Sequence, residues 1–326
     1  MDINKKKLSH DLLHIENIEK ECDTMVENLR KAVLHQLNRK GAVVGISGGI
    51  DSSATLALSV KAFGAKNVLG VILPESESSS DSEVMAKDLA KKFGVEVVVE
   101  NITGALKGFG CYSRRDEAIS NVVPEFNPET DKSKIVINQR IDKNIPPLFS
   151  VTVISPDGKE KTKVLSTKDY LQIVASSNFK QRSRMSMLYY HAERLYYAVI
   201  GTPNRHEVEQ GFFVKHGDGG ADVMPIANLY KTQVYQLAEY LGVPQDIINR
   251  TPTTDTYSAE QTQEEFFFQM PHKTMDLISY GLENEYSVKE IAEAVEKSEK
   301  EIKSILTNLE RKRKTTEYLR MRPIFF

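Results

Sequence analysis

The chain has 326 residues, of which 40% are hydrophobic and 27% are charged, which is the composition of a folded globular protein and excludes a disordered one. Its 43 basic and 45 acidic residues leave a net charge of −2, which excludes a uniformly basic surface for nucleic acid or anionic lipid. Two cysteines, Cys22 and Cys111, are too few for a disulfide framework, and no signal core or membrane-spanning apolar run is visible, so a cytoplasmic protein is expected.

The first hundred residues alternate helical and strand patterns. Apolar residues three and four apart over 15–37 predict an amphipathic helix. Short apolar runs predict three strands at 42–46, 68–73 and 95–99. The segments between them predict helices at 52–63 and 82–93. This alternation indicates an α/β fold, a doubly wound parallel sheet flanked by helices, with ligands at the carboxyl ends of the strands.

The pattern loosens from about 108 to 167, which we interpret as an insertion. Within it, a Pro-Asp-Gly turn at 156–158 lies between two apolar runs and predicts a small β-hairpin. A helix over 167–196 then leads into a fourth parallel strand at 197–200. Further helices are predicted at 231–241, 288–296 and 299–313, the last two beginning with Ser-x-x-Glu capping boxes. We therefore expect one domain over 1–326, with the insertion 108–167 inside it and a helical segment, 283–326, packed on it.

The first predicted strand ends in the small-residue run VVGISGGIDSS at 43–53. Gly48 and Gly49 allow a sharp turn and a close approach to a ligand, while Ser47, Ser52 and the first amides of the next helix can donate to anionic oxygens. A Walker A loop ends in lysine and a hydroxyl residue, whereas this run carries Asp51. It therefore predicts a pyrophosphate cradle of another type, with an ordinary strand-to-helix turn as the alternative.

The fourth predicted strand ends in a comparable loop, GTPNRHE at 201–207. Both loops lie at the carboxyl edge of one predicted sheet, so Asp51 and Glu207 could share a cation. Mg²⁺ is bound by one or two carboxylates together with substrate phosphates, so this pair fits a bound triphosphate. Taken alone, Glu207 is better explained as a solvated acid at a helix start.

Two further stretches contain several charged residues. In NFKQRSRM at 178–185, Lys180 and Arg184 share one helical face, and their cations could hold a phosphate or a carboxylate. A solvated basic face is the alternative there. In GFFVKHGDGGADVMPI at 211–226, glycines frame Lys215, Asp218 and Asp222 in a tight loop. An acid at such a place could bind ammonium and accept its proton.

Taken together with LYKTQV at 229–234, this ordered series of motifs resembles the ammonia-dependent NAD synthetases of the ATP pyrophosphatase superfamily. The resemblance covers the chain outside the insertion. It implies that ATP adenylates the nicotinate carboxylate of deamido-NAD with release of pyrophosphate, and that ammonia then displaces AMP to give NAD. It also implies a homodimer that uses Mg²⁺ and takes ammonia either free or from a separate glutaminase chain, with no nucleic acid or membrane as partner.

The resemblance further implies roles residue by residue. The phosphates of ATP would contact Ser47, Gly48, Gly49, Asp51, Ser52, Thr202, Lys231 and Thr253. The metal ion would be held by Asp51, Glu207 and Thr253. The acid substrate and ammonia would be placed by Asn178, Lys180, Arg182, Arg184, Lys215, Asp218 and Asp222. Of all these, the catalytic residues would be Asp51, Lys215 and Asp218.

Two departures from the family pattern leave the identity of the acid open. Gln263 stands where the family has an acidic residue, and the aromatic triplet Phe266–Phe268 follows it. The insertion is also longer than the family pattern expects. A divergent subgroup with the same chemistry on another carboxylate is therefore the alternative to deamido-NAD.

Other functional interpretations of the sequence have less support. The tRNA thiolases, GMP synthetase and asparagine synthetase would show paired cysteines, a basic RNA surface or an N-terminal glutaminase nucleophile, and position 2 is Asp2. The run 287–314 has helix-turn-helix spacing with basic residues at 311–314, so a DNA-binding module is a remote alternative. A packed helical pair that closes the active site explains the same run. A relative that binds nucleotide without turning it over is disfavoured by the intact Asp51, Glu207 and Lys215.

Overall fold

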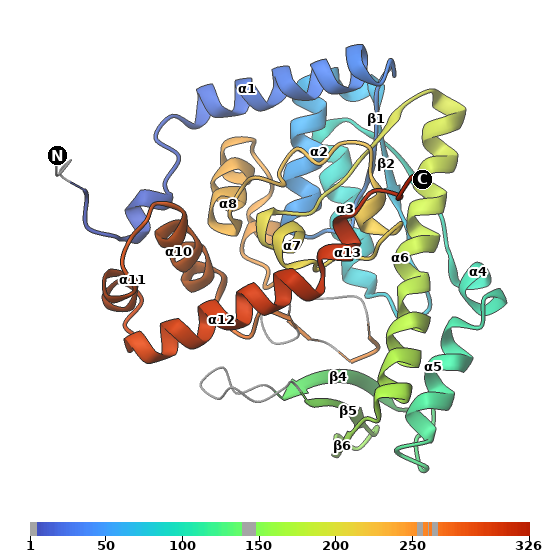
Figure 1. Ribbon diagram of the computed structural model, residues 1–326. Coiled ribbons are helices and arrows are strands. Elements are labelled where there is room, and N and C mark those ends of the chain that lie inside the picture. The colour runs from blue at the N-terminus through green and yellow to red at the C-terminus, as the bar shows by residue number, and fades with distance from the viewer. Residues whose placement is uncertain (1–4, 139–147, 253–256, 260, 263–266) are drawn as a thin grey trace.

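A computed structural model describes residues 5–138, 148–252, 257–259, 261–262 and 267–326. At its centre lies a four-stranded parallel sheet in the order β3-β2-β1-β7 (Figure 1). The strands are β1 (Ala42–Gly45), β2 (Val68–Ile72), β3 (Glu96–Val99) and β7 (Ala198–Ile200). Ala42 lies in register between Val68 and Ala198. The predicted doubly wound α/β fold is confirmed, and all four predicted strands are present.

Helices cover both faces of this sheet. Side chains of successive strand residues point to opposite faces. On one face Val44 belongs to a core shared with α1 (Ile18–Arg30), α2 (Ile50–Phe63), α3 (Ser80–Phe93) and α8 (Lys231–Tyr240). On the other face Val43 packs with α4 (Thr103–Gly108), α5 (Cys111–Ser120) and α6 (Thr167–Leu195). Strands β1, β2 and β7 are buried and continuously apolar, which explains why the sequence pattern identifies them, whereas β3 at the edge of the sheet is partly exposed.

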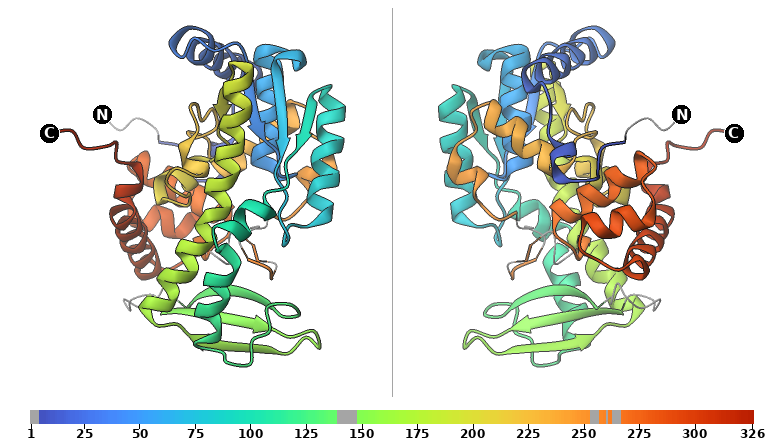
Figure 2. Two further views of the ribbon diagram at one scale, coloured as in Figure 1. Left: turned by 90° about the vertical axis from the view of Figure 1, so that its right-hand side faces the viewer. Right: turned by 90° about the vertical axis from the view of Figure 1, so that its left-hand side faces the viewer.

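The predicted insertion has more regular structure than its sequence indicates. Besides α5 it holds a three-stranded antiparallel sheet in the order β4-β5-β6, formed by β4 (Lys132–Asn138), β5 (Leu148–Ile154) and β6 (Glu160–Val164). The β5–β6 hairpin is confirmed, whereas α5 and β4 are missing from the prediction. This sheet has its own core with α6, including Ile135, Val151 and Ile173. Both views in Figure 2 place it at the opposite end of the molecule from α1.

The C-terminal helices pack around a further core that includes Leu277, Ile291 and Ile302. These helices are α10 (His272–Glu283), α11 (Val288–Ala294), α12 (Glu299–Thr315) and α13 (Glu317–Arg320). The capping boxes predicted for α11 and α12 are present. Helix α10 is not predicted from the sequence, and it starts after Pro271 without a side-chain cap. Its pattern therefore lacks the start signal that identifies the next two helices.

Short elements complete the fold. They are η1 (His10–Leu13), η2 (Lys31–Gln36), η3 (Ala65–Asn67), α7 (Arg205–Gln210), η4 (Asp218–Gly220) and α9 (Gln245–Ile248). The helix predicted over 15–37 is α-helical only to Arg30, because η2 continues it as a π-helix. Among the helices of the described residues, none combines the length and the apolar character needed to cross a bilayer.

Candidate active site

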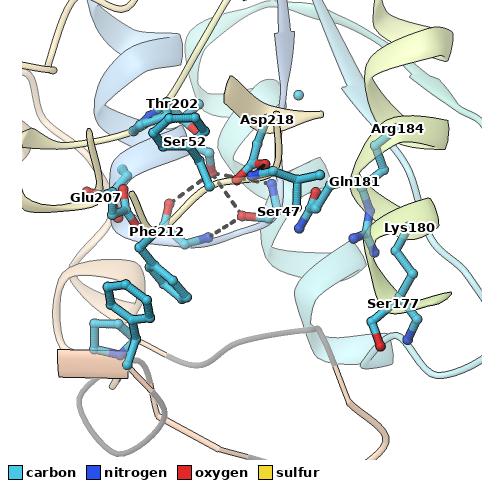
Figure 3. Close-up of a pocket in the computed structure, with 18 of the residues that line it drawn as sticks. Ser47, Ser52, Ser177, Lys180, Gln181, Arg184, Thr202, Glu207, Phe212 and Asp218 are labelled. Atoms are coloured by element: carbon cyan, nitrogen blue, oxygen red, sulfur yellow. Dashed lines mark hydrogen bonds between the residues drawn. The ribbon is translucent and has the colours of Figure 1, made fainter. Parts of the chain in front are cut away.

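A cavity of about 750 Å³ lies at the carboxyl ends of β1, β2 and β7. Its lining includes residues that directly follow each strand, among them Ser47 after β1, Leu73 after β2 and Thr202 after β7. Parallel α/β sheets bind their ligands at this edge, and the volume suits a nucleotide-sized molecule. In Figure 3, Glu207 and Lys180 lie at opposite sides of the view, with Ser47 and Ser52 between them.

The loop between β1 and α2 is held in shape by its own hydroxyl groups. The Oγ atoms of Ser47 and Ser52 lie 3.2 Å apart, and Ser52 Oγ donates to the Gly49 carbonyl at 3.0 Å. Gly48 has a φ of +73°, and a Cβ there would lie 2.9 Å from the Ser82 carbonyl oxygen, so only glycine fits. No side chain caps α2, which leaves its first amides for an anion.

Asp51, Glu207 and Lys231 form a buried charge cluster beside this loop. Asp51 makes an ion pair with Lys231 of α8 and accepts a hydrogen bond from Asn204 Nδ2 at 3.4 Å. Glu207 Oε2 accepts from the Asn204 backbone N–H at 2.9 Å, within a capping box that begins α7. Burial, and then the neighbouring Asp51 carboxylate, raise the pKa of Glu207 to about 8. The structure therefore brings together the two acids that the sequence predicts to meet.

This cluster suits a magnesium ion. The raised pKa of Glu207 means that two ionised carboxylates beside a single lysine are unfavourable, so the site favours an added positive charge, which a proton or a metal ion can supply. The described residues include no group of three or more His, Cys, Asp or Glu side chains that could hold a metal by themselves. Mg²⁺ commonly takes only one or two carboxylates and completes its shell with phosphate oxygens and water. Asp51 and Glu207 fit that pattern.

Asp218 contributes a further acid to the cavity from the loop after α7. Its Oδ1 accepts the Val214 N–H at 2.8 Å, which fixes the side chain at the start of η4. Burial raises the pKa of Asp218 to about 6, against the lowering effect of its backbone hydrogen bonds. The carboxyl group is thus ionised at neutral pH and can hold a small cation or accept a proton.

Lys180 of α6 lies within a network of buried ion pairs. Its Nζ is 2.8 Å from Glu75 Oε1 and 2.7 Å from Glu77 Oε2, and Arg115 of α5 also binds Glu77, at 2.7 Å. The pKa of Glu75 is lowered, because Lys180 and Tyr112 outweigh the effect of burial. The network joins α5, α6 and the loop after β2. Lys180, a predicted substrate ligand, lines the cavity but has two carboxylate partners within the protein.

Replacing Lys180 by methionine is expected to lower the free energy of unfolding by about 3–5 kcal/mol, because the buried Glu75 and the partly buried Glu77 lose their shared cation. Urea denaturation measures this loss. The control is Lys87→Met, which removes an exposed pair with Glu83 on α3 and should cost only about 0.3–0.5 kcal/mol. If Lys180→Met barely changes stability but raises the KM for the acid substrate, Lys180 is a substrate ligand and not a structural cation.

The other predicted site residues divide into two groups. Asn178 and Arg184 line the cavity, and Arg184 Nε donates to the Leu73 carbonyl at 3.3 Å. Lys215 does not line it, because its Nζ donates to the carbonyls of Tyr318 and Met321 at 2.8 and 3.2 Å. Four more predicted residues are also absent from the lining: Gly48, Arg182, Asp222 and Lys231.

Two of these residues have partners elsewhere in the protein. Asp222 accepts from the Tyr189 hydroxyl and the Val199 N–H, both at 2.8 Å. Arg182 Nε donates to the Lys215 carbonyl at 3.3 Å. Thr253, predicted to contact metal and phosphate, lies outside the described residues, as does Gln263.

Several cavity residues are absent from the sequence prediction. Arg250 lines the cavity and donates from Nη2 to Ser82 Oγ at 3.2 Å. Helix α12 supplies a row of polar side chains at Asn308, Arg311, Lys312 and Thr315. Their spacing of three and four residues is visible in the sequence, yet it is equally typical of a solvated helix face. The basic run that suggests a DNA-binding module thus contributes at least Arg311 and Lys312 to this cavity.

Comparison with known proteins gives a consistent result. The model of the family described as NAD synthase matches residues 21–126 and 149–323. An NH(3)-dependent NAD(+) synthetase from Mesorhizobium japonicum is 49% identical over 93% of this chain and 95% of its own length. The protein of that name from Rhizobium meliloti is 47% identical over 99% of this chain and 96% of its own length.

Solved structures show the same fold at lower identity. An NMN synthetase from Francisella tularensis has a TM-score of 0.64 at 22% identity, covering 96% of this chain and 99% of its own. An NH3-dependent NAD synthetase from Campylobacter jejuni has a TM-score of 0.61 at 19% identity, covering 95% of this chain and 99% of its own.

Proposed function

The chain belongs to the NAD synthase family, and from that premise we propose that its cavity holds ATP on the Ser47–Ser52 loop beside the acid to be activated. The chain is an ATP-dependent amide ligase that adenylates deamido-NAD and amidates the product with ammonia to give NAD. One juxtaposition supports the site assignment: the phosphate loop, the acids Asp51 and Glu207, and Asp218 all line the same cavity.

In the first step a nicotinate carboxylate oxygen attacks the α-phosphorus of ATP, and the bond to pyrophosphate breaks. Negative charge builds on the departing pyrophosphate, so donors placed in advance stabilise the transition state more than the ground state. We assign this role to the Ser47 and Ser52 hydroxyls and the first amides of α2, while the buried Lys231, outside the cavity lining, adds positive charge through its ion pair with Asp51. Mg²⁺ held by Asp51 and Glu207 would supply further positive charge there.

In the second step ammonia attacks the acyl carbon of the adenylate, and the bond to AMP breaks. The attacking nitrogen becomes positively charged and must lose a proton. Asp218 is ionised at neutral pH and lines the cavity, so we assign it as the group that places ammonium and accepts this proton. The homodimer and the source of ammonia implied by the resemblance stay predictions, as does the cytoplasmic location expected from the composition.

Purified protein with ATP, Mg²⁺, ammonium and deamido-NAD is expected to form NAD, AMP and pyrophosphate in equal amounts. Because one structure of this fold is titled an NMN synthetase, nicotinate mononucleotide is the competing acid to test, and we expect deamido-NAD to give the higher kcat/KM. Chromatography of the nucleotides measures both. Formation of ADP would contradict the adenylation chemistry, and a preference for the mononucleotide would contradict only the choice of acid.

A further inference from the structure

Three segments that are distant in sequence from the phosphate loop form another part of the cavity wall. They are the antiparallel sheet of the insertion, the stretch 267–270 and helix α12. Among their cavity-lining residues are Ile137 of β4, Phe149 of β5, Phe267, Gln269, Arg311, Lys312 and Thr315. We call this set the distal wall. Three of these side chains are apolar, and Arg311 and Lys312 are the cations of the set.

A hydrogen bond joins the first two segments, because Gln269 Nε2 donates to the Ile137 carbonyl of β4 at 3.0 Å. Nearby, the Ala259 N–H donates to the Ser133 carbonyl of the same strand at 3.1 Å. Strand β4 lies inside 127–148, the stretch that the family match leaves out. The insertion and part of the aromatic stretch, which depart from the family pattern at separate places in the sequence, are therefore neighbours in one wall of the cavity.

Lys312 has an unusual environment for a lysine. Its Nζ donates to the Phe267 carbonyl at 2.6 Å and lies 3.9 Å from the centre of the Phe267 ring. That ring stacks in turn on Phe212, with ring centres 4.5 Å apart. No acidic residue within the described ranges forms an ion pair with Lys312. Burial lowers the pKa of Lys312 to about 8.

An ammonium group has three N–H donors, and one carbonyl uses only one of them. The ring face stabilises the cation but accepts no conventional hydrogen bond. A partly desolvated cation without a carboxylate partner is costly, and an anion that enters the cavity offsets this cost. Lys312 is thus positioned in the free protein to bind an anionic group of a ligand.

We propose that Lys312, resting on the Phe267 ring, binds an anionic group of the acid substrate and so helps to select that substrate. This inference rests on the proposed function, because deamido-NAD carries a carboxylate and phosphates of its own. In the proposed site the phosphates of ATP contact other groups, namely the Ser47–Ser52 loop and the start of α2, with Lys231 paired to Asp51 beside them. On this proposal, the insertion and the aromatic stretch at Phe267, which depart from the family pattern, contribute to recognition of the acid.

The test compares steady-state kinetics of Lys312→Met, Lys312→Gln and Lys312→Arg with the parent enzyme. The two neutral variants should raise the KM for deamido-NAD by about 10- to 100-fold, the range of a lost hydrogen bond to a charged group. The arginine variant keeps the charge and should recover most of that loss. The KM for ATP should stay within about twofold, since separate residues bind its phosphates. Lys314→Met is the matched control, because Lys314 is an exposed lysine on the same helix outside the cavity lining.

Two results would overturn the inference: an unchanged KM for deamido-NAD in both neutral variants, or an equal rise in the KM for ATP. The glutamine variant decides the case if the methionine variant does not fold. A parent enzyme that turns over nicotinate mononucleotide but not deamido-NAD would refute the proposed substrate alone. The same comparison of KM values with nicotinate mononucleotide then decides the role of Lys312.

Discussion

Replacing Asp51 by asparagine is expected to reduce ATP-dependent pyrophosphate release by about 10³-fold, because the site loses a carboxylate that we assign to the metal ion and that orients Lys231. Asparagine keeps the shape of the side chain, and its carbonyl can still accept a hydrogen bond from the buried lysine. An alanine there would instead leave Lys231 as a buried cation without its Asp51 partner and would endanger the fold. The measurement is the rate of pyrophosphate release at saturating ATP and deamido-NAD.

Asp81→Asn is the matched control for this variant. Asp81 is an exposed acid in the first turn of α3, just as Asp51 lies in the first turn of α2. It therefore reports the loss of a favourable interaction with the helix dipole, which is worth about 0.3–1 kcal/mol, without any loss of cation binding. Urea denaturation of both variants checks the fold. If Asp51→Asn retains more than a tenth of the parent rate, the assignment of Asp51 to the metal is wrong.

Replacing Asp218 by asparagine should separate the two half-reactions. The amide cannot accept a proton, so formation of NAD should fall by about 10²- to 10⁴-fold, the usual contribution of a general base. Adenylation does not require that proton transfer, so exchange of labelled pyrophosphate into ATP in the presence of deamido-NAD should persist near the parent rate. An equal loss in both assays, with unchanged stability, would contradict the role given to Asp218.

The pH dependence of the parent enzyme provides an independent check on Asp218. Its pKa lies at about 6, so the carboxylate is present above that pH and becomes protonated below it. At a constant concentration of free ammonia, kcat/KM for ammonia should fall tenfold per pH unit below about pH 6. This acid limb should be absent in Asp218→Asn. If kcat/KM still falls below about pH 6 in Asp218→Asn, the decrease is caused by another titrating residue.

The segment from β1 to α2 shows which structural features the sequence alone can predict. Its strand is buried on both faces, its loop needs Gly48 for a φ of +73°, and its helix follows at once. Each of these requirements is local, so each leaves a pattern of a few consecutive residues. The same holds for the capping boxes of α11 and α12, and the structure confirms them all.

The sequence does not predict the partners of charged side chains, because these partners depend on which distant residues the fold brings close together. Lys180 and Glu75 are 105 residues apart, and Lys215 reaches the carbonyl of Tyr318 across 103 residues. The sequence around a lysine therefore does not distinguish a side chain that binds a substrate from one that pairs with other residues of the protein. Lys312 likewise contacts Phe267, which is 45 residues away, and no local pattern records that arrangement.

Helix α6 has a consequence for attempts to shorten this protein. One 29-residue helix carries Arg184 at the cavity and Ile173 in the core of the insertion sheet, so one rigid element serves two cores. Excision of 108–167 would therefore not release a detachable module. It would uncover an apolar stripe on α6 where Ile173 and Tyr170 now pack, and exposed stripes of that kind promote aggregation. A minimal version of this enzyme would need a redesigned α6 as well as a shorter loop.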